Sequence, residues 1–454
     1  MTLATVPRYD RTQISTLGKH AIVAGAGMGG LLATRILADA FEEVTLLERD
    51  PLPAEPAARK GIPQSNHAHA MLEAGRATLE DLFPGYGEAV RSAGGLRIDM
   101  ATAFDYYYRG SFLADGEDPL PMLCGSRPLL EQVTRERVAD LEGVTVRQEC
   151  RFIDYVTDDT TTVNGMVIAN ETDSEEALSA DLIVDATGRS SRTPRWLERH
   201  GYASPPVDEV QIDLAYSTAV VERPSDAEYG LLIAPSPDHP RGGACLPIED
   251  EQWIVTLFGL HGEHPPTDVQ GFQEFAGSLP TPEMEQMLDA NRLVSEEIHR
   301  YPFPSNRWCH YEQLDRFPDG LVVTGDAIAS FNPIYGQGMS VAALDALQLH
   351  HALAADGLDG LASRFFDRVT DVVKVIWRMT VGTDFEFPQT TGPKPRGTDL
   401  LNGYLSRLIR TGYTDPHVSD AFARVHRLEQ PPTALIRPSI LGRVLLPASL
   451  HKQL

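Results

Sequence analysis

The sequence has few cysteines, no closely spaced cysteine pair and no long hydrophobic run. Its 454 residues include four scattered cysteines, Cys124, Cys150, Cys245 and Cys309. This scatter argues against a disulfide framework or a cysteine metal site and predicts reduced thiols. No apolar run reaches the roughly 18 to 20 residues needed to span a bilayer. Residues 1–20 also lack the apolar stretch of a signal peptide. We therefore expect a cytoplasmic protein with no metal site.

Basic residues are scarce as well. The chain has 64 Asp and Glu against 39 Lys and Arg, a net charge of −25, and only five of its cations are lysines. An acidic surface repels phosphate backbones, so we expect no nucleic acid partner. Acid excess with few lysines is typical of a salt-rich cytosol, but a GC-rich genome gives the same composition with no physical cause. The length suggests roughly three domains or lobes.

The chain opens with a strand–helix–strand pattern. The apolar run Ala21–Val23 predicts a strand, residues 31–40 predict a helix, and Val44–Leu47 predict a second strand. Short connections between such elements are typical of a parallel sheet covered by helices. The sequence therefore predicts an α/β fold that begins with a Rossmann-like unit.

A glycine motif, Gly25-x-Gly27-x-x-Gly30, lies between the first strand and the helix. The first glycine allows a tight turn, the second lets the backbone approach a pyrophosphate, and the third packs helix against strand. Glu48 lies 23 positions after Gly25, at the end of the second strand. There it is placed to accept hydrogen bonds from a ribose hydroxyl. The motif predicts a dinucleotide site but does not separate NAD from FAD.

Three later segments favour FAD, a long cofactor that several strands must hold. Gly188 and Gly325-Asp326 each follow an apolar strand, where the aspartate can accept a hydrogen bond from a ribityl hydroxyl. Residues 332–339 then open a helix, and main-chain N–H groups at such a helix start can face an anion. This last segment contains Pro333, Gly336, Gln337, Gly338 and Met339.

The remaining pattern indicates an inserted domain. We predict the first part of the dinucleotide domain over 18–202, with strands within 95–120 on the substrate side. A substrate domain with an antiparallel sheet is expected over 203–303, the second part of the dinucleotide domain over 304–385, and a helical region over 386–454.

Finer expectations concern individual segments. Residues 144–156 and 162–169 are expected to pair as strands, and the acidic run 173–176 is expected to be a loop. Within the inserted domain, strands are expected at 211–221, 230–234 and 253–259, followed by one helical segment near 272–288. Six aromatic side chains could line a substrate cavity or simply pack the sheet: Phe104, Tyr106, Tyr107, Tyr108, Trp253 and Phe258.

These motifs resemble a known family. Gly61–Gln64 with His67 and His69, Leu82–Gly85, and the run from Gly325 to Ser340 are similar to the FAD-dependent monooxygenases that include p-hydroxybenzoate hydroxylase and squalene epoxidase. The nearest likeness is to the flavin epoxidases of polyether biosynthesis and their unassigned relatives, over residues 18 to 445. The resemblance implies a FAD domain of the glutathione-reductase type.

The resemblance also implies roles for particular residues. Arg49 would lie near the adenosine, Arg127 would contact the cofactor, and the backbone of Gly336–Gly338 would face the flavin, where the chemistry occurs. The electron donor would be NAD(P)H or a separate flavin reductase. Thr187-Gly188 stands where aromatic hydroxylases have Asp-Gly, a segment linked there to NADPH. This difference argues against direct use of NADPH.

The implied reaction is insertion of one oxygen atom from O2, through a flavin C4a-hydroperoxide, into an apolar, olefinic, isoprenoid or polyketide small molecule. No acid–base set for phenol hydroxylation is evident. One alternative is a prenyl-chain reductase, whose usual Tyr-x-Trp-x-Phe-Pro stretch is absent. Others are a flavin-dependent halogenase, whose tryptophan-rich motif is absent, and a non-catalytic flavin-binding protein.

Two features remain open between structural and functional roles. His67 and His69 could be structural or lie beside the flavin. The tail Leu435–Leu445 mixes aliphatic residues with arginines, and it could pack on the body or make peripheral contact with a membrane.

Overall fold

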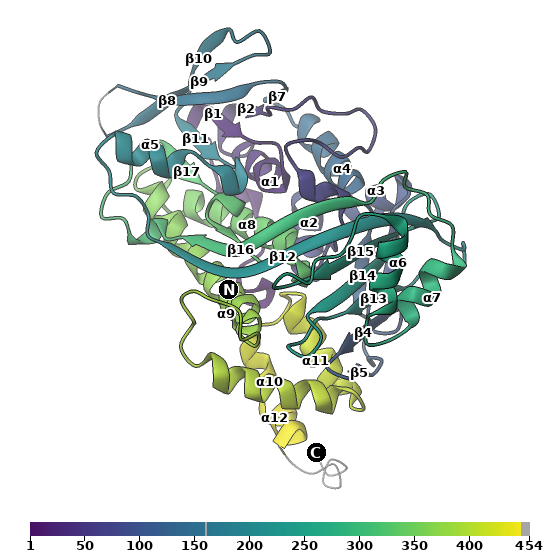
Figure 1. Cartoon of the computed structure of the whole chain (residues 1–454). Helices are drawn as coiled ribbons and strands as arrows, with labels where there is room; N and C mark the ends of the chain where they lie inside the picture. Colours follow the sequence, from purple (N-terminus) through teal and green to yellow (C-terminus); the bar gives the residue numbers. More distant parts are fainter. Residues whose placement is uncertain (159–160, 446–454) are drawn as a thin grey trace.

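The computed structural model describes residues 1–158 and 161–445. A parallel sheet lies at its centre, with the strand order β17-β11-β1-β2-β7. Helices pack on one face of this sheet, and an antiparallel segment within residues 151–179 lies on its other side (Figure 1), so both faces are covered by other layers of secondary structure. The strands are β1 (Gly18–Ala24), β2 (Phe41–Leu47), β7 (Val144–Arg147), β11 (Leu182–Asp185) and β17 (Leu321–Val323). The α/β fold is as predicted.

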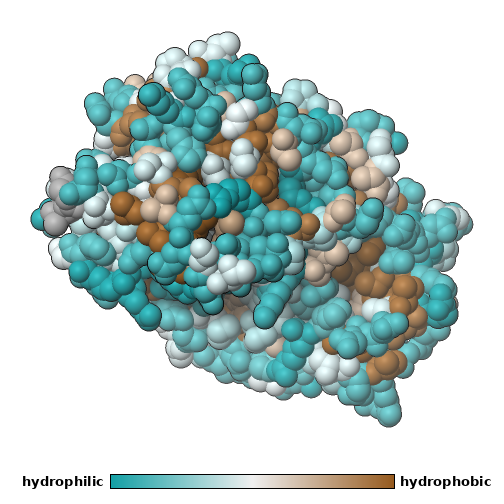
Figure 2. Space-filling view, turned by 90° about the horizontal axis from the view of Figure 1, so that it is seen from above, coloured by the Kyte–Doolittle hydropathy of each residue, from teal (hydrophilic) through white to brown (hydrophobic). Residues whose placement is uncertain are grey.

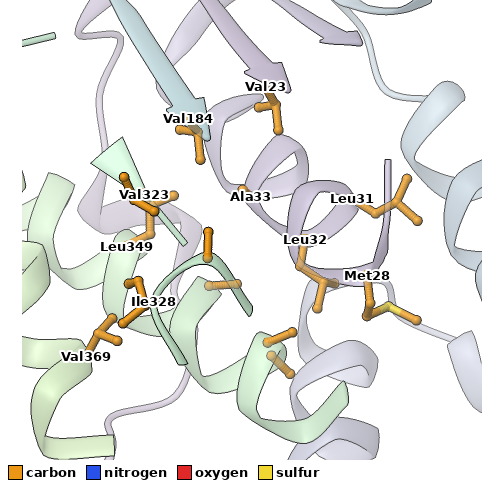
Figure 3. Close-up of a cluster of buried hydrophobic side chains, with 14 of the residues drawn as sticks. Val23, Met28, Leu31, Leu32, Ala33, Val184, Val323, Ile328, Leu349 and Val369 are labelled. Atoms are coloured by element: carbon orange, nitrogen blue, oxygen red, sulfur yellow. The ribbon is translucent and has the colours of Figure 1, made fainter. Parts of the chain in front are cut away.

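Buried aliphatic side chains fix the helices against this sheet. Val23, Val184 and Val323 come from three neighbouring strands and belong to one large buried cluster with residues of the helices, including Leu349 and Val369 (Figure 3). The helices concerned are α1 (Met28–Leu37), α4 (Arg127–Ala139), α8 (Gly338–Asp356) and α9 (Leu361–Asp384). The β1–α1–β2 unit is the strand–helix–strand pattern predicted from the sequence.

A mixed sheet of eight strands stands beside the parallel sheet. Its order is β18-β16-β12-β15-β14-β13-β4-β5, so strands from an early segment join those of the inserted region. β16 runs past residue 303, where the substrate domain is predicted to end. The strands are β4 (Phe104–Tyr108), β5 (Ser111–Phe112), β12 (Val207–Glu222), β13 (Gly230–Ile233), β14 (Arg241–Ile248), β15 (Gln252–Gly259), β16 (His299–Cys309) and β18 (Ala329–Ser330).

One face of this eight-stranded sheet is closed by two short helices, α6 (Val269–Gly277) and α7 (Glu283–Ala290). Trp253 packs with residues of these helices in a separate buried cluster. Side chains alternate between the two faces of a strand, so those that point away from α6 and α7 form a second face, which these two helices leave uncovered. The expectation of one helical segment near 272–288 was wrong in detail, because residues 278–282 separate two helices.

Two strand predictions were wrong. Residues 144–156 do not form one strand, because Glu149 adopts a positive φ of 59° and turns the chain between β7 and β8 (Arg151–Thr157). Only β8 pairs with β9 (Val163–Ala169). The acidic run 173–176 is not entirely loop, since Glu175 begins the edge strand β10 (Glu175–Ser179). Its glutamates remain exposed, so their charge carries no burial penalty there.

Shorter elements complete the body of the protein. β3 (Leu96–Asp99) pairs with β6 (Pro121–Cys124) in a two-stranded sheet. The remaining helices of this part include α2 (Glu73–Leu82), α3 (Tyr86–Ser92) and α5 (Thr193–Arg199).

The C-terminal region forms three helices beneath the body, α10 (Thr398–Gly412), α11 (Pro416–His426) and α12 (Pro438–Leu445) (Figure 1). Leu435 and Ile440 pack with Leu408 of α10 and Val418 of α11 in their own buried cluster, and Tyr108 and Leu113 of the body pack against this cluster. Peripheral membrane contact stays a prediction, and residues 446–454 of the predicted helical region lie outside the described part. Within the described residues, no helix is both long and apolar enough to cross a membrane. The face seen in Figure 2 is largely hydrophilic, with separate hydrophobic patches.

Candidate functional site

A cavity of about 510 Å³ lies where the carboxyl ends of the parallel strands meet the free face of the eight-stranded sheet. Ligands bind at this end of the strands in open α/β sheets. Of the cofactor residues predicted from the sequence, all but Gly30 line the cavity: Gly25, Gly27, Glu48, Arg49, Arg127, Gly188, Gly325, Asp326, Pro333, Gly336, Gln337, Gly338 and Met339.

The first glycine loop shows why each position excludes a side chain. Gly25 has a φ of +102°, and a Cβ added there would lie 2.5 Å from the carbonyl oxygen of Ala186. A Cβ on Gly30 would lie 1.8 Å from the carbonyl oxygen of Gly25, so Gly30 holds α1 against the loop rather than touching the cavity. Gly27 is different, since its nearest neighbour would be Ile62 at 3.6 Å. Nothing in the fold itself demands glycine at position 27, which leaves ligand approach as the reason.

The other glycines form a cradle with open space in front of it. Gly188 and Gly325 have φ values of +76° and +65°, and no heavy atom lies within 4 Å of a Cβ added to either one. The same open space exists at Gly338, which begins α8. A long dinucleotide with a pyrophosphate fits such a line of exposed backbone ending at a helix N-terminus. The residues present therefore fit FAD.

A buried ion network supports the loop from below. The Arg59 guanidinium lies 2.8 Å from Glu48 and 2.6 Å from Glu131, and it donates to the carbonyl oxygen of Ala26 at 3.0 Å. Arg127 pairs with the other oxygen of Glu131 at 3.0 Å. Four buried charges thus neutralise one another, which the low dielectric of the interior requires. Sequence reasoning missed Arg59 and Glu131, because their pairing depends on contacts across 72 residues.

Glu48 is tightly held in this network. Its carboxylate accepts hydrogen bonds from the backbone N–H groups of Ala26 at 2.9 Å and Asp50 at 3.0 Å. Burial opposes ionisation, but Arg59 and these two donors outweigh it and hold the pKa of Glu48 below its usual range. The carboxylate is therefore ionised at neutral pH. With four acceptor positions on its two oxygens, it retains capacity for a ribose hydroxyl.

Asp326 and the segment 332–335, which follow β17, face the cavity. The Asp326 side chain is open to the cavity, and its position deep in the protein raises its pKa against the opposing effect of Arg189 and Arg127. Pro333 and Gly338 are also exposed there, although they lie in the interior of the chain's fold. A bound ligand would cover these surfaces.

A buried aspartate holds the segment that faces the cavity. Asp384, at the end of α9, accepts hydrogen bonds from the side-chain amides of Asn306 at 2.7 Å and Asn332 at 2.8 Å, and from the Tyr335 hydroxyl at 3.4 Å. Burial raises the pKa of Asp384 to about 7 against the effect of these donors. Sequence reasoning missed Asp384, and nothing in its immediate sequence could have indicated it.

The free face of the eight-stranded sheet forms the opposite wall. Register places Tyr106, Leu232, Ala244 and Thr256 side by side across β4, β13, β14 and β15. A second row contains Phe258, Tyr216 and Tyr301, and all of these residues line the cavity. Of the six aromatic residues named from the sequence, Phe104, Tyr106 and Phe258 line it, whereas Tyr107, Tyr108 and Trp253 do not.

The two histidines occupy the junction of the walls. His67 is buried, and its Nδ1 lies 2.6 Å from the Thr218 hydroxyl, so it anchors the segment to the sheet. Thr218 in turn bonds Thr256, which accepts from the N–H of Ala68. Both histidines line the cavity. His67 is therefore an anchoring residue at the site, whereas the ring of His69 is bonded locally, to the carbonyl oxygen of His67.

Comparisons with known proteins agree with this geometry. The family model described as "FAD binding domain" matches residues 19–364. The chain is 31% identical over 448 residues to Protein Rv3254 of Mycobacterium tuberculosis (strain ATCC 25618 / H37Rv), covering 94% of this chain and 93% of that protein. A kynurenine 3-monooxygenase of Salinispora tropica is 26% identical over 355 residues, covering 74% of this chain and 73% of that protein.

The fold is also shared with a solved enzyme structure. The flavin-dependent brominase Bmp2 aligns with a TM-score of 0.64 at 16% identity, covering 90% of this chain and 94% of that one. Identity this low shows a common fold and says nothing of a common reaction. The chain belongs to the FAD binding domain family, within the superfamily of FAD-dependent monooxygenases.

Proposed function

We propose that the protein inserts one oxygen atom from O2 into an apolar, olefinic small molecule of isoprenoid or polyketide type, as an epoxidase does. The observation that supports this proposal most is the shared cavity. One wall is the glycine cradle that fits FAD, and the facing wall is a sheet face rich in aromatic and aliphatic side chains. The substrate would therefore lie directly against the redox group.

The chain's own residues bind, orient and exclude water. Phe104, Leu232, Leu246 and Phe258 present apolar surface to the substrate, which favours an apolar molecule over water. FAD held in the glycine cradle would, once reduced by two electrons from the donor, deliver one oxygen atom of O2 to the substrate, and the other atom would leave as water with two protons from solvent. Exclusion of water from the cavity would limit the side reaction in which hydrogen peroxide is released and no oxygen is transferred to the substrate.

Rival reactions receive less support from the cavity. Flavin-dependent halogenases carry a lysine, whereas no lysine lines this cavity in the described part of the chain. A prenyl-chain reductase would use the same apolar wall without oxygen, and its characteristic aromatic stretch is replaced by Gly243–Pro247. The similarity in fold to a brominase does not make halogenation the preferred reaction.

The test uses labelled oxygen. The FAD-loaded protein, a flavin reductase and a panel of polyenes and isoprenoids are incubated under ¹⁸O2, and products are analysed by mass spectrometry. One labelled atom should enter each product molecule, and label from H2¹⁸O should not. A gain of two hydrogens without oxygen would establish the reductase alternative, and incorporation of added halide would establish the halogenase alternative. The Gly27→Val variant serves as the control without cofactor.

A further inference from the structure

His69 presents a single hydrogen-bond acceptor to the cavity. Its Nδ1 lies 2.8 Å from the backbone carbonyl oxygen of His67. A carbonyl oxygen can only accept, so Nδ1 carries the proton and donates. The neutral ring therefore bears its lone pair on Nε2. This atom has no hydrogen-bond partner within residues 1–158 and 161–445, and the side chain lines the cavity.

Neutrality of the ring follows from its surroundings. Burial, together with the nearby Arg127 guanidinium, lowers the pKa of His69 to about 4. Arg127 is itself paired with Glu131, which offsets the positive charge beside His69. At neutral pH, His69 can accept a hydrogen bond but cannot form an ion pair.

The position of His69 places this acceptor on the substrate's side of the cavity. The preceding residues are fixed to the sheet wall, since His67 bonds Thr218 and the N–H of Ala68 donates to Thr256. On the other side, a Cβ added to Gly336 would lie 3.7 Å from the Cβ of Ala70. The segment 67–70 therefore spans from the apolar sheet face to the segment that begins α8.

Other polar groups on the same wall are less selective. The hydroxyls of Thr218 and Thr256 are bonded to each other at 2.7 Å. The Tyr301 hydroxyl can act as donor or acceptor, and no hydrogen bond fixes the tautomer of the His426 ring within the described residues. Only His69 combines a fixed tautomer with an open acceptor at this junction of the described chain.

We propose that the substrate is an apolar molecule carrying one uncharged O–H or N–H group, and that His69 is the specificity-determining residue that accepts its hydrogen bond. This proposal rests on the proposed function, because it assumes that the sheet side of the cavity takes the substrate. It adds that a pure hydrocarbon leaves the Nε2 lone pair of His69 buried and unpaired. A carboxylate would bring two acceptors together and would be rejected.

The test compares two probes that differ only in the donor. Protein loaded with FAD is titrated at neutral pH with 2-naphthol and with its methyl ether, 2-methoxynaphthalene, and binding is followed by the change in the bound flavin's absorption. One neutral hydrogen bond to a buried acceptor predicts that 2-naphthol binds about tenfold more tightly. His69→Leu should remove this preference. His69→Gln should keep most of it, because its amide oxygen can accept near the same place.

Two results would overturn the proposal. Equal affinity of the wild type for both probes, or binding of neither, would show that His69 does not select a donor. A loss of FAD affinity in His69→Leu would show instead that this ring contacts the cofactor. The titration needs no oxygen and no turnover. The labelled-oxygen experiment can therefore fail while the probe preference survives, and the reverse also holds.

Discussion

Gly27 offers a way to remove the cofactor without disturbing the fold. It is the N-cap residue of α1 with a φ of −75°, and a Cβ added there meets only Ile62 at 3.6 Å. Any residue tolerates this backbone conformation. Replacing Gly27 with valine should therefore lower the free energy of unfolding of the apoprotein by about 1 kcal/mol or less, the range of a changed N-cap.

The effect on cofactor binding should be much larger. The Gly27 position lines the cavity where the pyrophosphate is expected to approach the N-terminus of α1. A branched side chain there would hold the pyrophosphate away from the main-chain N–H groups. A hydrogen bond to a charged group contributes about 1.5–3 kcal/mol, so losing two of them raises the Kd for FAD by about 10²- to 10⁴-fold.

The assay is a FAD titration of the apoprotein followed by flavin fluorescence, with a thermal melt of each variant. Gly403→Val is the matched control, because Gly403 lies on the exposed surface of α10 and a Cβ added there meets nothing within 4 Å. The control should bind FAD like the wild type. A Gly27→Val protein that melts normally and also binds FAD with wild-type affinity would refute the assignment of this loop.

Three further predictions concern protonation, positioning and electron supply. Burial lowers the pKa of four histidines to about 3 or 4 and raises the pKa of two aspartates to about 7. These groups are His67, His69, His350, His426, Asp345 and Asp384. Near pH 5, unfolding therefore takes up close to four protons and releases about two, and the free energy of unfolding should fall by roughly 3 kcal/mol per pH unit on acidification. Urea unfolding at pH 5, 6 and 7 checks this, and equal stability at pH 5 and 7 would contradict it. Asp384→Ala leaves the amides of Asn306 and Asn332 without their acceptor, so unfolding should become easier by about 2–4 kcal/mol and FAD affinity should fall; wild-type stability in urea would count against the positioning role. NADPH should reduce the bound flavin slowly without substrate or reductase in stopped-flow mixing, because no second strand–glycine–helix unit is evident in the sequence; rapid, stoichiometric NADPH binding would be the opposite result.

The cofactor side of the cavity was predictable because main-chain conformation defines it. A positive φ at Gly25, and the close approach of Gly30 in α1 to the Gly25 carbonyl oxygen, require glycine whatever the rest of the chain does. These requirements appear as a local motif with fixed spacing. The same holds for Gly325, whose φ of +65° follows a short apolar strand. Local spacing was therefore sufficient for this half of the site.

The substrate side was not predictable in the same way. β14 and β16 were not expected as strands, because β14 begins with two glycines and contains Pro247, and β16 contains Pro302 and Pro304. Proline cannot donate to a ladder, but Pro304 lies at the irregularity in the β12–β16 register between Gln211 and Leu214, where the ladder is already interrupted. Sequence patterns do not reveal where a ladder is interrupted.

The acidic run 173–176 also shows that the composition of one segment does not reveal its strand pairing. Charge predicts exposure, and Glu175 and Glu176 are exposed, but exposure does not separate a loop from an edge strand. What makes β10 a strand is its pairing with Ala169 and Ile168 of β9. Pairing is a property of two segments, and one segment's composition carries only half of the information.

The role of His69 depends on both kinds of information. The sequence places a histidine two positions after His67, and the structure bends the chain so that Nδ1 reaches the His67 carbonyl oxygen. That local bond fixes the tautomer, whereas the long-range bonds of His67 and Ala68 to β12 and β15 decide where the free Nε2 is presented. A short-range hydrogen bond therefore determines which nitrogen of His69 carries the proton, and long-range hydrogen bonds determine where in the cavity the acceptor nitrogen lies. Substituting Thr218 or Thr256 would shift the position of Nε2 without changing the protonation of the His69 ring. Substituting His69 would remove the acceptor and leave its surroundings in place.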